Sequence, residues 1–220
     1  MLTNLELVLL SLAVPVALVD WYAVARGDAG RERIAKPAVI AVLLAAAMLG
    51  DPHARPVSLL LGAALGASLV GDLLLLPPVR FRAGLTAFLL AHVAYLAAFL
   101  LGPLNAVTAL IGAVLGVGVL VLVGRPVLRG ATAAGMRRPV AAYFAAIVLM
   151  AIAATASGSV VAAAGAWLFV ASDAVLGWRQ FVVSPESRAM APAWHRLGVM
   201  VPYHLGQILL TAAILIQRAS

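Results

Sequence analysis

Two aspartates lie inside long apolar stretches, where a carboxylate is costly. Asp72 lies within residues 57–76 and Asp173 within residues 160–178. A carboxylate at the centre of a membrane helix costs about 2.5–3.5 kcal/mol on insertion scales, so such residues usually face a polar interior and take part in function. The alternative is an interhelical hydrogen bond that only holds the helices together. Two such aspartates with further polar neighbours favour a functional site.

Two histidines, His92 and His204, lie in other apolar stretches, so the candidate site combines two carboxylates with two imidazoles. One compatible chemistry is acid–base catalysis, with one carboxyl protonated and the other ionised. The second is metal ligation around an open position, in a metal-dependent lipid hydrolase. The third is a proton path through a small proton-coupled transporter that uses Asp72 and Asp173. The sequence has no His-Glu-x-x-His motif and no histidine pair at i, i+4, which weakens the metal hypothesis.

The composition indicates an integral membrane protein. Hydrophobic residues make up 65% of the chain and charged residues 10%, against about 25% charged in soluble domains. We therefore expect residues 1–220 to form a single transmembrane domain with a retained N-terminal helix. The absence of cysteine excludes disulfides and thiolate chemistry. Basic loops that meet anionic membrane lipids explain the net charge of +7 better than a nucleic-acid partner does.

The apolar stretches predict an all-α fold with eight transmembrane helices. They cover residues 4–24, 37–50, 57–76, 83–101, 104–123, 139–157, 160–178 and 197–217. Helix-breaking residues mark the boundaries at Gly50-Asp51-Pro52, Pro77-Pro78, Gly102-Pro103 and Ser157-Gly158. The longest connection, about 179–196, is expected to be an ordinary polar loop.

The basic residues predict the orientation in the cell membrane. Thirteen of the fifteen Lys and Arg residues lie in alternate connections, and only Arg55 and Arg218 lie on the other side. By the positive-inside rule, both termini are external and the thirteen-charge side is cytoplasmic. Asp72 and Asp173 then lie near the cytoplasmic ends of their helices, and the outer half contains mainly small and aliphatic residues. This pattern predicts a cavity that opens to the cytoplasm.

The two halves of the chain resemble each other, which suggests repeats at 1–103 and 104–220. Lys36-Pro37 matches Arg138-Pro139, and Gly71-Asp72 matches Ser172-Asp173, at offsets of 102 and 101 residues. A unit of four spans preserves orientation, so the repeats would be parallel. The duplication predicts that the two aspartates face each other across the interface between the repeats.

Several motifs together resemble those of the lysoplasmalogenase family, also called YhhN-like. The paired signature of that family is similar to SLVGDLLLL followed by GLTAFLLAHVAYLAAF. Its second Ser-Asp element is similar to LFVASDAVLGWRQF, its closing helix to YHLGQILL, and its early Lys-Pro to Lys36-Pro37. The resemblance runs from about residue 36 to residue 215, in the family's order.

The resemblance implies a membrane hydrolase that cleaves the vinyl ether bond of a lysoplasmalogen. The products would be a fatty aldehyde and a glycerophosphocholine or glycerophosphoethanolamine, and the reaction needs no cofactor. The family positions are Asp72, His92, Tyr95, Asp173, Tyr203, Gln207 and Lys36. In place of the second tyrosine of the closing motif this chain has His204, a change that is either neutral or alters substrate choice. The resemblance does not indicate the oligomeric state.

The implied chemistry suits the residue types. An enol ether is cleaved when its β-carbon is protonated and water captures the resulting oxocarbenium ion, so paired carboxylates can act much as they do in glycosidases. We expect Asp72, Asp173 and His92 to be catalytic, with the choice of acid left open. The substrate-binding residues are expected to be Tyr95, Tyr143, Tyr203, His204, Gln207 and Lys36. Arg80, Arg82 and Arg179 are candidates to bind the phosphodiester, or else only set the topology.

Overall fold

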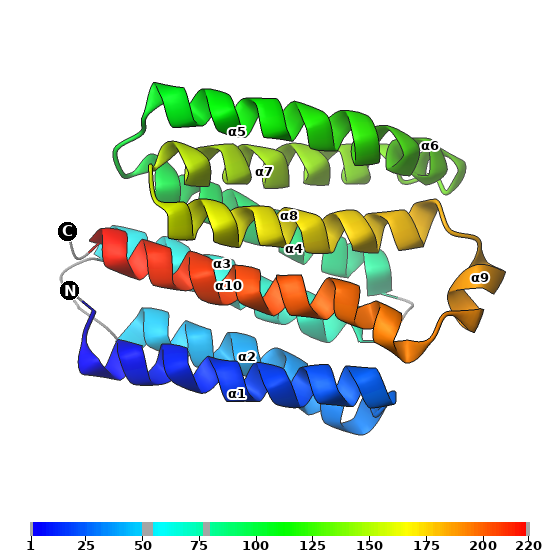
Figure 1. Cartoon of the computed structure of the whole chain (residues 1–220), viewed down its shortest axis with the longest axis horizontal. Helices are drawn as coiled ribbons and strands as arrows, with labels where there is room; N and C mark the ends of the chain where they lie inside the picture. The colour runs from blue at the N-terminus through cyan, green and yellow to red at the C-terminus, as the bar shows by residue number, and fades with distance from the viewer. Residues whose placement is uncertain (1, 50–54, 77–79, 219–220) are drawn as a thin grey trace.

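The computed structural model describes residues 2–49, 55–76 and 80–218, which form a bundle of antiparallel helices (Figure 1). The helices are α1 (Asn4–Arg26), α2 (Ala29–Leu49), α3 (Arg55–Leu75), α4 (Phe81–Leu100), α5 (Ala106–Val119), α6 (Arg125–Ala133), α7 (Arg137–Ala156), α8 (Val160–Phe181), α9 (Pro185–Met190) and α10 (Leu197–Arg218). A π-helical segment, η2 (Leu120–Gly124), joins α5 to α6, and a 3-10 turn, η3 (Ala193–Arg196), precedes α10. These ranges contain no strand, which confirms the predicted all-α fold.

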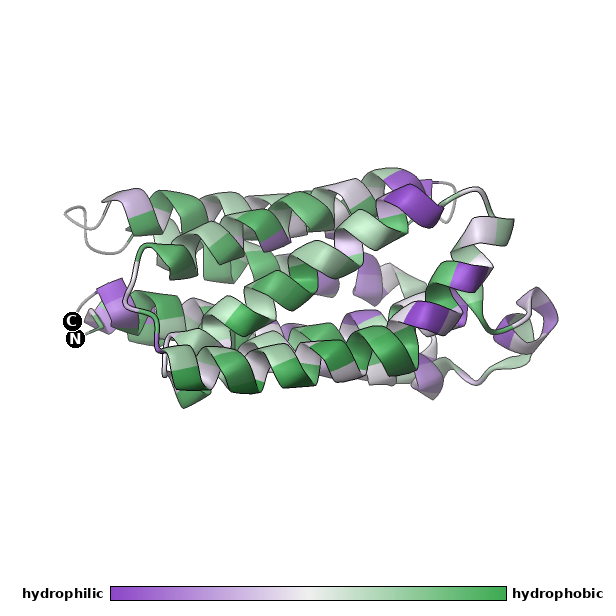
Figure 2. Ribbon diagram, turned by 90° about the horizontal axis from the view of Figure 1, so that it is seen from above, coloured by the Kyte–Doolittle hydropathy of each residue, from purple (hydrophilic) through white to green (hydrophobic). Residues whose placement is uncertain are grey.

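The bundle has the composition of a multi-pass membrane protein. Hydrophobic residues cover its length, and hydrophilic residues gather toward its two ends (Figure 2). Within the described ranges, seven helices are long and apolar enough to cross a membrane. The remaining predicted span, residues 37–50, corresponds to α2, which is 21 residues long and packs against both α1 and α3. Its first turns contain Arg31, Glu32, Arg33 and Lys36, so its apolar part is shorter than in the other helices.

Two helices differ from their predicted bounds. The predicted start of α2 at residue 37 is wrong: the carboxylate of Asp28 accepts a hydrogen bond from the backbone N–H of Arg31 at 3.1 Å, and this cap starts the helix at residue 29. Lys36 and Pro37 therefore lie inside the helix. The fifth predicted span ends at 123, yet the helix continues through η2 to Ala133, 28 residues in all. Such a helix is about 42 Å long, against a hydrocarbon thickness of about 30 Å, so α6 projects beyond the apolar layer.

The connection between α8 and α10 also differs from the expectation. Instead of an ordinary loop, α8 continues to Phe181, and α9 and η3 follow. The Ser184 side chain caps α9 by accepting a hydrogen bond from the backbone N–H of Ser187 at 3.2 Å. The predicted breakers at 50–52 and 77–78 fall outside the described residues. The cap of α5 by Asn105 and the left-handed Gly158 agree with the breakers predicted near 103 and 158.

Polar residues also occupy the end of the bundle where the chain starts and finishes. The guanidinium of Arg218 forms a buried ion pair with Glu6 and donates a hydrogen bond to the Ser58 hydroxyl at 2.7 Å. The sequence predicts mainly small and aliphatic residues in this half, and it does not predict this buried polar cluster. Because these residues come from α1, α3 and α10, the cluster ties three helices together at the end opposite the two aspartates.

A close contact between α8 and α10 depends on two glycines. A Cβ atom at Gly206 would lie 2.9 Å from the carbonyl oxygen of Gly165 and 3.0 Å from the backbone nitrogen of Phe169. Small residues allow membrane helices to approach this closely. Since Tyr203 and Gln207 flank Gly206 on α10, this contact fixes their distance from α8.

Replacement of Gly206 by valine is expected to destabilise the bundle. The added atoms would force α8 and α10 apart, and overpacking of this kind costs about 1–3 kcal/mol. The apparent melting temperature of the purified protein in detergent should fall by several degrees. The control is Gly118→Ala, because a Cβ atom there meets no atom within 4 Å. Equal melting temperatures for both variants would show that the close approach is not needed.

Candidate active site

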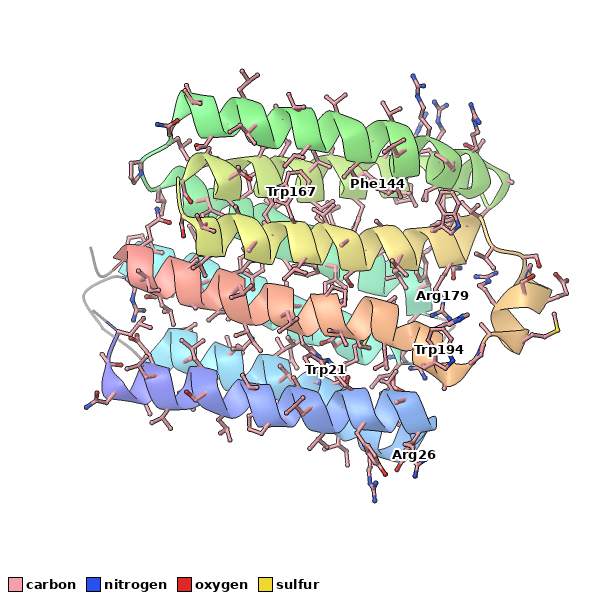
Figure 3. The ribbon with its side chains drawn as sticks, in the orientation of Figure 1. Trp21, Arg26, Phe144, Trp167, Arg179 and Trp194 are labelled. Carbon is pink, nitrogen blue, oxygen red and sulfur yellow. The ribbon has the colours of Figure 1, made fainter. Side chains whose placement is uncertain are left out.

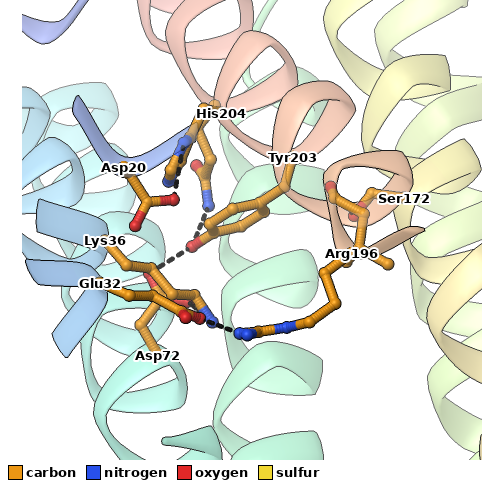
Figure 4. Close-up of polar contacts among 10 residues, drawn as sticks. Asp20, Glu32, Lys36, Asp72, Ser172, Arg196, Tyr203 and His204 are labelled. Atoms are coloured by element: carbon orange, nitrogen blue, oxygen red, sulfur yellow. Dashed lines mark hydrogen bonds and ion pairs between the residues drawn. The ribbon is translucent and has the colours of Figure 1, made fainter. Parts of the chain in front are cut away.

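A cavity of about 630 Å³ opens at the end of the bundle opposite the chain termini. Its wall is built from α2, α3, α4, α8 and α10, and from the connection that contains α9 and η3. Asp72 and Asp173 both line it. Lys36 and Tyr203 line it too and lie beside Asp72 (Figure 4). The two carboxyl groups that the sequence singled out therefore share one cavity, where each has a different set of neighbours.

Asp72 lies in the wall of this cavity and contacts an ammonium group and a phenol. Its Oδ1 atom is 3.1 Å from Nζ of Lys36, and its Oδ2 atom accepts a hydrogen bond from the hydroxyl of Tyr203 at 2.8 Å. The Asp72 side chain is fully buried and that of Lys36 nearly so. A positive charge and a hydrogen-bond donor both favour the charged form of a carboxyl group. These two contacts of Asp72 therefore favour an ionised carboxylate.

Two further predicted residues, Tyr95 and Gln207, support Tyr203 through hydrogen bonds and do not line the cavity. The hydroxyl of Tyr95 donates to Oε1 of Gln207 at 2.5 Å, and Nε2 of Gln207 reaches the Tyr203 hydroxyl at the long distance of 3.5 Å. Tyr95 and Gln207 are fully buried and are absent from the lining of the cavity. Their position is that of residues that orient Tyr203 toward Asp72, which differs from the expected direct contact with substrate.

Asp173 lies across the cavity among different partners. Its Oδ2 atom accepts a hydrogen bond from the Tyr143 hydroxyl at 2.5 Å and lies 3.4 Å from Nε2 of His92. Nδ1 of His92 is 2.5 Å from the carbonyl oxygen of Phe88. Because a carbonyl only accepts hydrogen bonds, Nδ1 must carry a hydrogen, which leaves Nε2 to face the carboxyl group. Nε2 of His92 thus points toward Asp173 at 3.4 Å without forming a hydrogen bond to it.

The contacts of the two aspartates follow the same scheme. Asp72 on α3 is contacted from α2 and from α10, whereas Asp173 on α8 is contacted from α7 and from α4. In each case one partner comes from the preceding helix and the other from the last helix of the opposite half. This scheme is what parallel repeats would produce, although Lys36 and Tyr143 occupy different turns of their helices. The division at residues 103 and 104 stays a prediction.

His204 lies behind the wall and is absent from the lining of the cavity. Its Nδ1 atom accepts a hydrogen bond from the indole N–H of Trp21 at 3.1 Å and is 3.9 Å from Oδ2 of Asp20. Both His204 and Asp20 are fully buried (Figure 4). His204 thus packs α10 against α1, and the direct contact with substrate that the sequence analysis expected would need a different arrangement.

Arginines surround the mouth of the cavity. The lining includes Arg33, Arg179, Arg188 and Arg196. Arg196 forms an ion pair with Glu32, and Arg188 donates a hydrogen bond to the side chain of Gln180 at 2.9 Å. Arg179, at the end of the bundle where α8 finishes (Figure 3), is close enough to Arg188 and Arg196 for their charges to interact.

Of the three arginines predicted to bind the phosphodiester, only one lines the cavity. Arg179 lines the cavity, whereas Arg80 and Arg82 are exposed and absent from its lining. Arg188 and Arg196 were missed because the connection that carries them was taken for an ordinary loop. Its high arginine content was the available signal.

The arrangement offers no recognisable set of metal ligands. In the part of the chain that the structure describes, no three His, Asp or Glu side chains come together as a group that could hold a metal ion. His92 lies beside Asp173, and His204 lies beside Asp20, so the two histidines belong to different clusters. The donor geometry therefore gives no support to the metal-hydrolase alternative.

The fold and the cavity define a class: a multi-pass helical membrane protein with two inward-facing aspartates at one end of the bundle. The sequence gives the family. The model of the YhhN family matches residues 32–214, and the chain belongs to this family. The matched region includes Lys36, both aspartates and the whole hydrogen-bond chain around Tyr203. No curated protein and no solved structure matches the chain.

Proposed function

We propose that this protein is a lysoplasmalogenase, which hydrolyses the vinyl ether bond of a lysoplasmalogen in the cavity that contains Asp72 and Asp173. Membership of the YhhN family supports the reaction class. The observation that carries the proposal is a pair of carboxyl groups in a single cavity, one 3.4 Å from Nε2 of His92 and the other 3.1 Å from the ammonium group of Lys36. Two carboxyl groups in contrasting surroundings are the usual arrangement for an acid and a base.

Asp173 is the acid in this proposal. In this proposal the Asp173 carboxyl group is protonated when substrate binds, and its proton passes to the β-carbon of the enol ether, which leaves an oxocarbenium ion and a carboxylate. The hydrogen bond from the Tyr143 hydroxyl stabilises that carboxylate as it forms. His92 then holds the position of Asp173 and returns a proton to it after each turnover.

Asp72 is the carboxylate that stabilises the cation and activates water. Its negative charge offsets the developing oxocarbenium charge, and it accepts a proton from the water that attacks the cationic carbon. The hemiacetal that forms then collapses to a fatty aldehyde and an alcohol on the glycerol. The net change adds one water molecule, with one hydrogen on the former β-carbon and one on the released alcohol. No redox partner is needed.

The arginines at the cavity mouth favour a substrate with a phosphate group. Arg196 is neutralised by Glu32 and Lys36 by Asp72, while Arg33, Arg179 and Arg188 form no ion pair with a carboxylate among the described residues. Arginine is well suited to phosphate because its planar donors bind two oxygens at once. By the positive-inside rule this end is cytoplasmic, so the substrate would be a lysolipid of the inner leaflet.

Replacement of Arg179 by glutamine is expected to raise KM for the lysoplasmalogen about tenfold, because a hydrogen bond to a charged group contributes about 1.5–3 kcal/mol. The value of kcat should change little, since the phosphate is remote from the reacting bond. Arg129→Gln is the matched control, because Arg129 is exposed on α6 and absent from the lining of the cavity. Equal KM values in the two variants would remove Arg179 from head-group binding.

The proposal is tested with purified protein in lipid nanodiscs and three lysophospholipids that differ only in the linkage of the chain. The alkenyl lipid should release a long-chain aldehyde, whereas the alkyl ether and the ester should remain intact. Cleavage of the ester alone would indicate a different lipid hydrolase. No cleavage, combined with proton flux into liposomes that depends on Asp72 and Asp173, would favour the transporter. Aldehyde release that stops on chelation and returns with zinc would favour the metal enzyme.

A further inference from the structure

An apolar recess lies directly beside Asp173 and shares part of its wall with the polar cavity. Five residues line both spaces, and they are Leu75, Phe81, Phe88, Asp173 and Leu176. The recess is enclosed by α4, α6, α7 and α8, and apart from Asp173 and Tyr143 its lining is apolar. Asp173 therefore sits at the boundary between a space lined by arginines and a space lined by hydrocarbon.

The recess is elongated along the helices. On α7 its lining begins at Val140 and ends at Ile147, and on α8 a stripe of the same spacing runs from Val170 to Gly177. Residues at i, i+3, i+4 and i+7 share one face of a helix. Seven residues of helix rise by about 10 Å, so the side chains that line the recess are spread over about that length of α7 and α8. Val127 of α6 also lines the recess.

The recess is nearly closed as it stands. Its free volume is about 30 Å³, which is room for about one water molecule. The rings of Phe81 and Phe181, in edge-to-face contact at 5.9 Å, stand near the cytoplasmic ends of α4 and α8. Both side chains are only partly buried. A hydrocarbon chain would enter when these side chains move aside, and the helices would not need to move.

We infer that this recess is the binding site for the single hydrocarbon chain of the lysolipid, an inference that rests on the proposed function. A chain that leaves the ether bond and enters the recess passes Asp173 at its first carbons. The phosphate lies in the other direction, among the arginines of the cavity. This arrangement places the reacting double bond at the boundary between the two spaces, beside the Asp173 carboxyl group and Nε2 of His92.

Gly177 allows the recess to be filled without touching the polar residues. A Cβ atom at this position would meet Val127 Cγ1 at 3.5 Å, which is ordinary contact. Gly177→Ala is therefore the matched control, since it fits without moving its neighbour. Gly177→Leu places three more carbons between α8 and α6, in the space that the chain would occupy.

The experiment uses the full-length protein in nanodiscs and a 1-O-alkyl lysophosphocholine, which lacks the reactive double bond, with a photoreactive diazirine in the half of its chain nearest the ether. Adducts are mapped by mass spectrometry, with and without unlabelled alkyl lysolipid as competitor. We expect competable adducts on the recess-facing positions of α7 and α8. Labelling of these positions should fall at least about fivefold in Gly177→Leu, the factor that corresponds to the lower limit for overpacking, and stay within about twofold in Gly177→Ala.

The outcomes separate this inference from the proposed function. Adducts confined to lipid-facing residues such as those of α5, or equal labelling of the recess in Gly177→Leu and Gly177→Ala, would overturn the recess as a chain site. Aldehyde release from the alkenyl lipid together with either of these results would leave the proposed function standing. Competable labelling of the recess without any aldehyde release would establish a lysolipid-binding site and would contradict the proposed hydrolase activity.

Discussion

Asp173→Asn is expected to lower kcat for aldehyde release by about 10²–10⁴, the usual contribution of a general acid. Asparagine keeps the volume of the side chain and can still accept the hydrogen bond from Tyr143, but it cannot deliver a proton to carbon. The variant should therefore fold normally and still bind an alkyl lysolipid. The measurement is the initial rate of aldehyde release at saturating substrate, with the melting temperature as a check on folding.

Two further variants separate the acid from the residues that position it. His92→Gln should lower kcat less than Asp173→Asn, because Asp173 can still take its proton from water. Glu186→Gln changes an exposed carboxylate on α9 and should leave the rate unchanged. Full activity in Asp173→Asn would exclude Asp173 as the proton donor.

Asp72→Asn is expected to abolish turnover and also to destabilise the protein. The variant loses the carboxylate that offsets the positive charge of the oxocarbenium ion, and it leaves the ammonium group of Lys36 buried without a counter-charge. Breaking a buried ion pair by removal of one partner costs about 3–5 kcal/mol. Both the rate of aldehyde release and the apparent melting temperature should fall.

The double variant Lys36→Met, Asp72→Asn distinguishes the two effects. Removal of both partners takes away the unpaired charge, so most of the lost stability should return. Activity should stay absent, since Asp72, the carboxylate that activates water, is still missing. Recovery of activity along with stability would mean that Asp72 serves the fold and not the reaction.

The main features of the fold were accessible from the sequence because a membrane limits the possible structures. Every backbone polar group in hydrocarbon must be paired within its own segment, so long apolar stretches become helices. The start of α2 was misplaced because its first turns are charged, and hydropathy cannot detect a cap such as that from Asp28. The continuation of α5 into α6 was missed for the same reason, since Arg125 and Arg129 lie in a helix that extends beyond the apolar layer.

The sequence predicts which residues belong to the candidate site better than it predicts how those residues are arranged. The cost of a charge in hydrocarbon singled out Asp72 and Asp173, and the family motifs added Tyr203 and Gln207. Sequence could not reveal that His204 faces Trp21 and Asp20, because a histidine on an apolar helix looks the same in a wall or in a core. The contrast between the two carboxyl groups also depends on partners from distant helices, which no local pattern records. Lys36 is one such partner, since it meets Asp72 from another helix.

The most direct test of the proposed chemistry is hydrolysis of the alkenyl lysolipid in deuterium oxide, with mass analysis of the aldehyde at early times. Transfer of a proton from the enzyme to the β-carbon predicts one deuterium on the carbon next to the aldehyde group and slower release than in ordinary water. In Asp173→Asn this product should be lost. Aldehyde that lacks the deuterium, or aldehyde that forms equally fast in Asp173→Asn, would contradict protonation by Asp173.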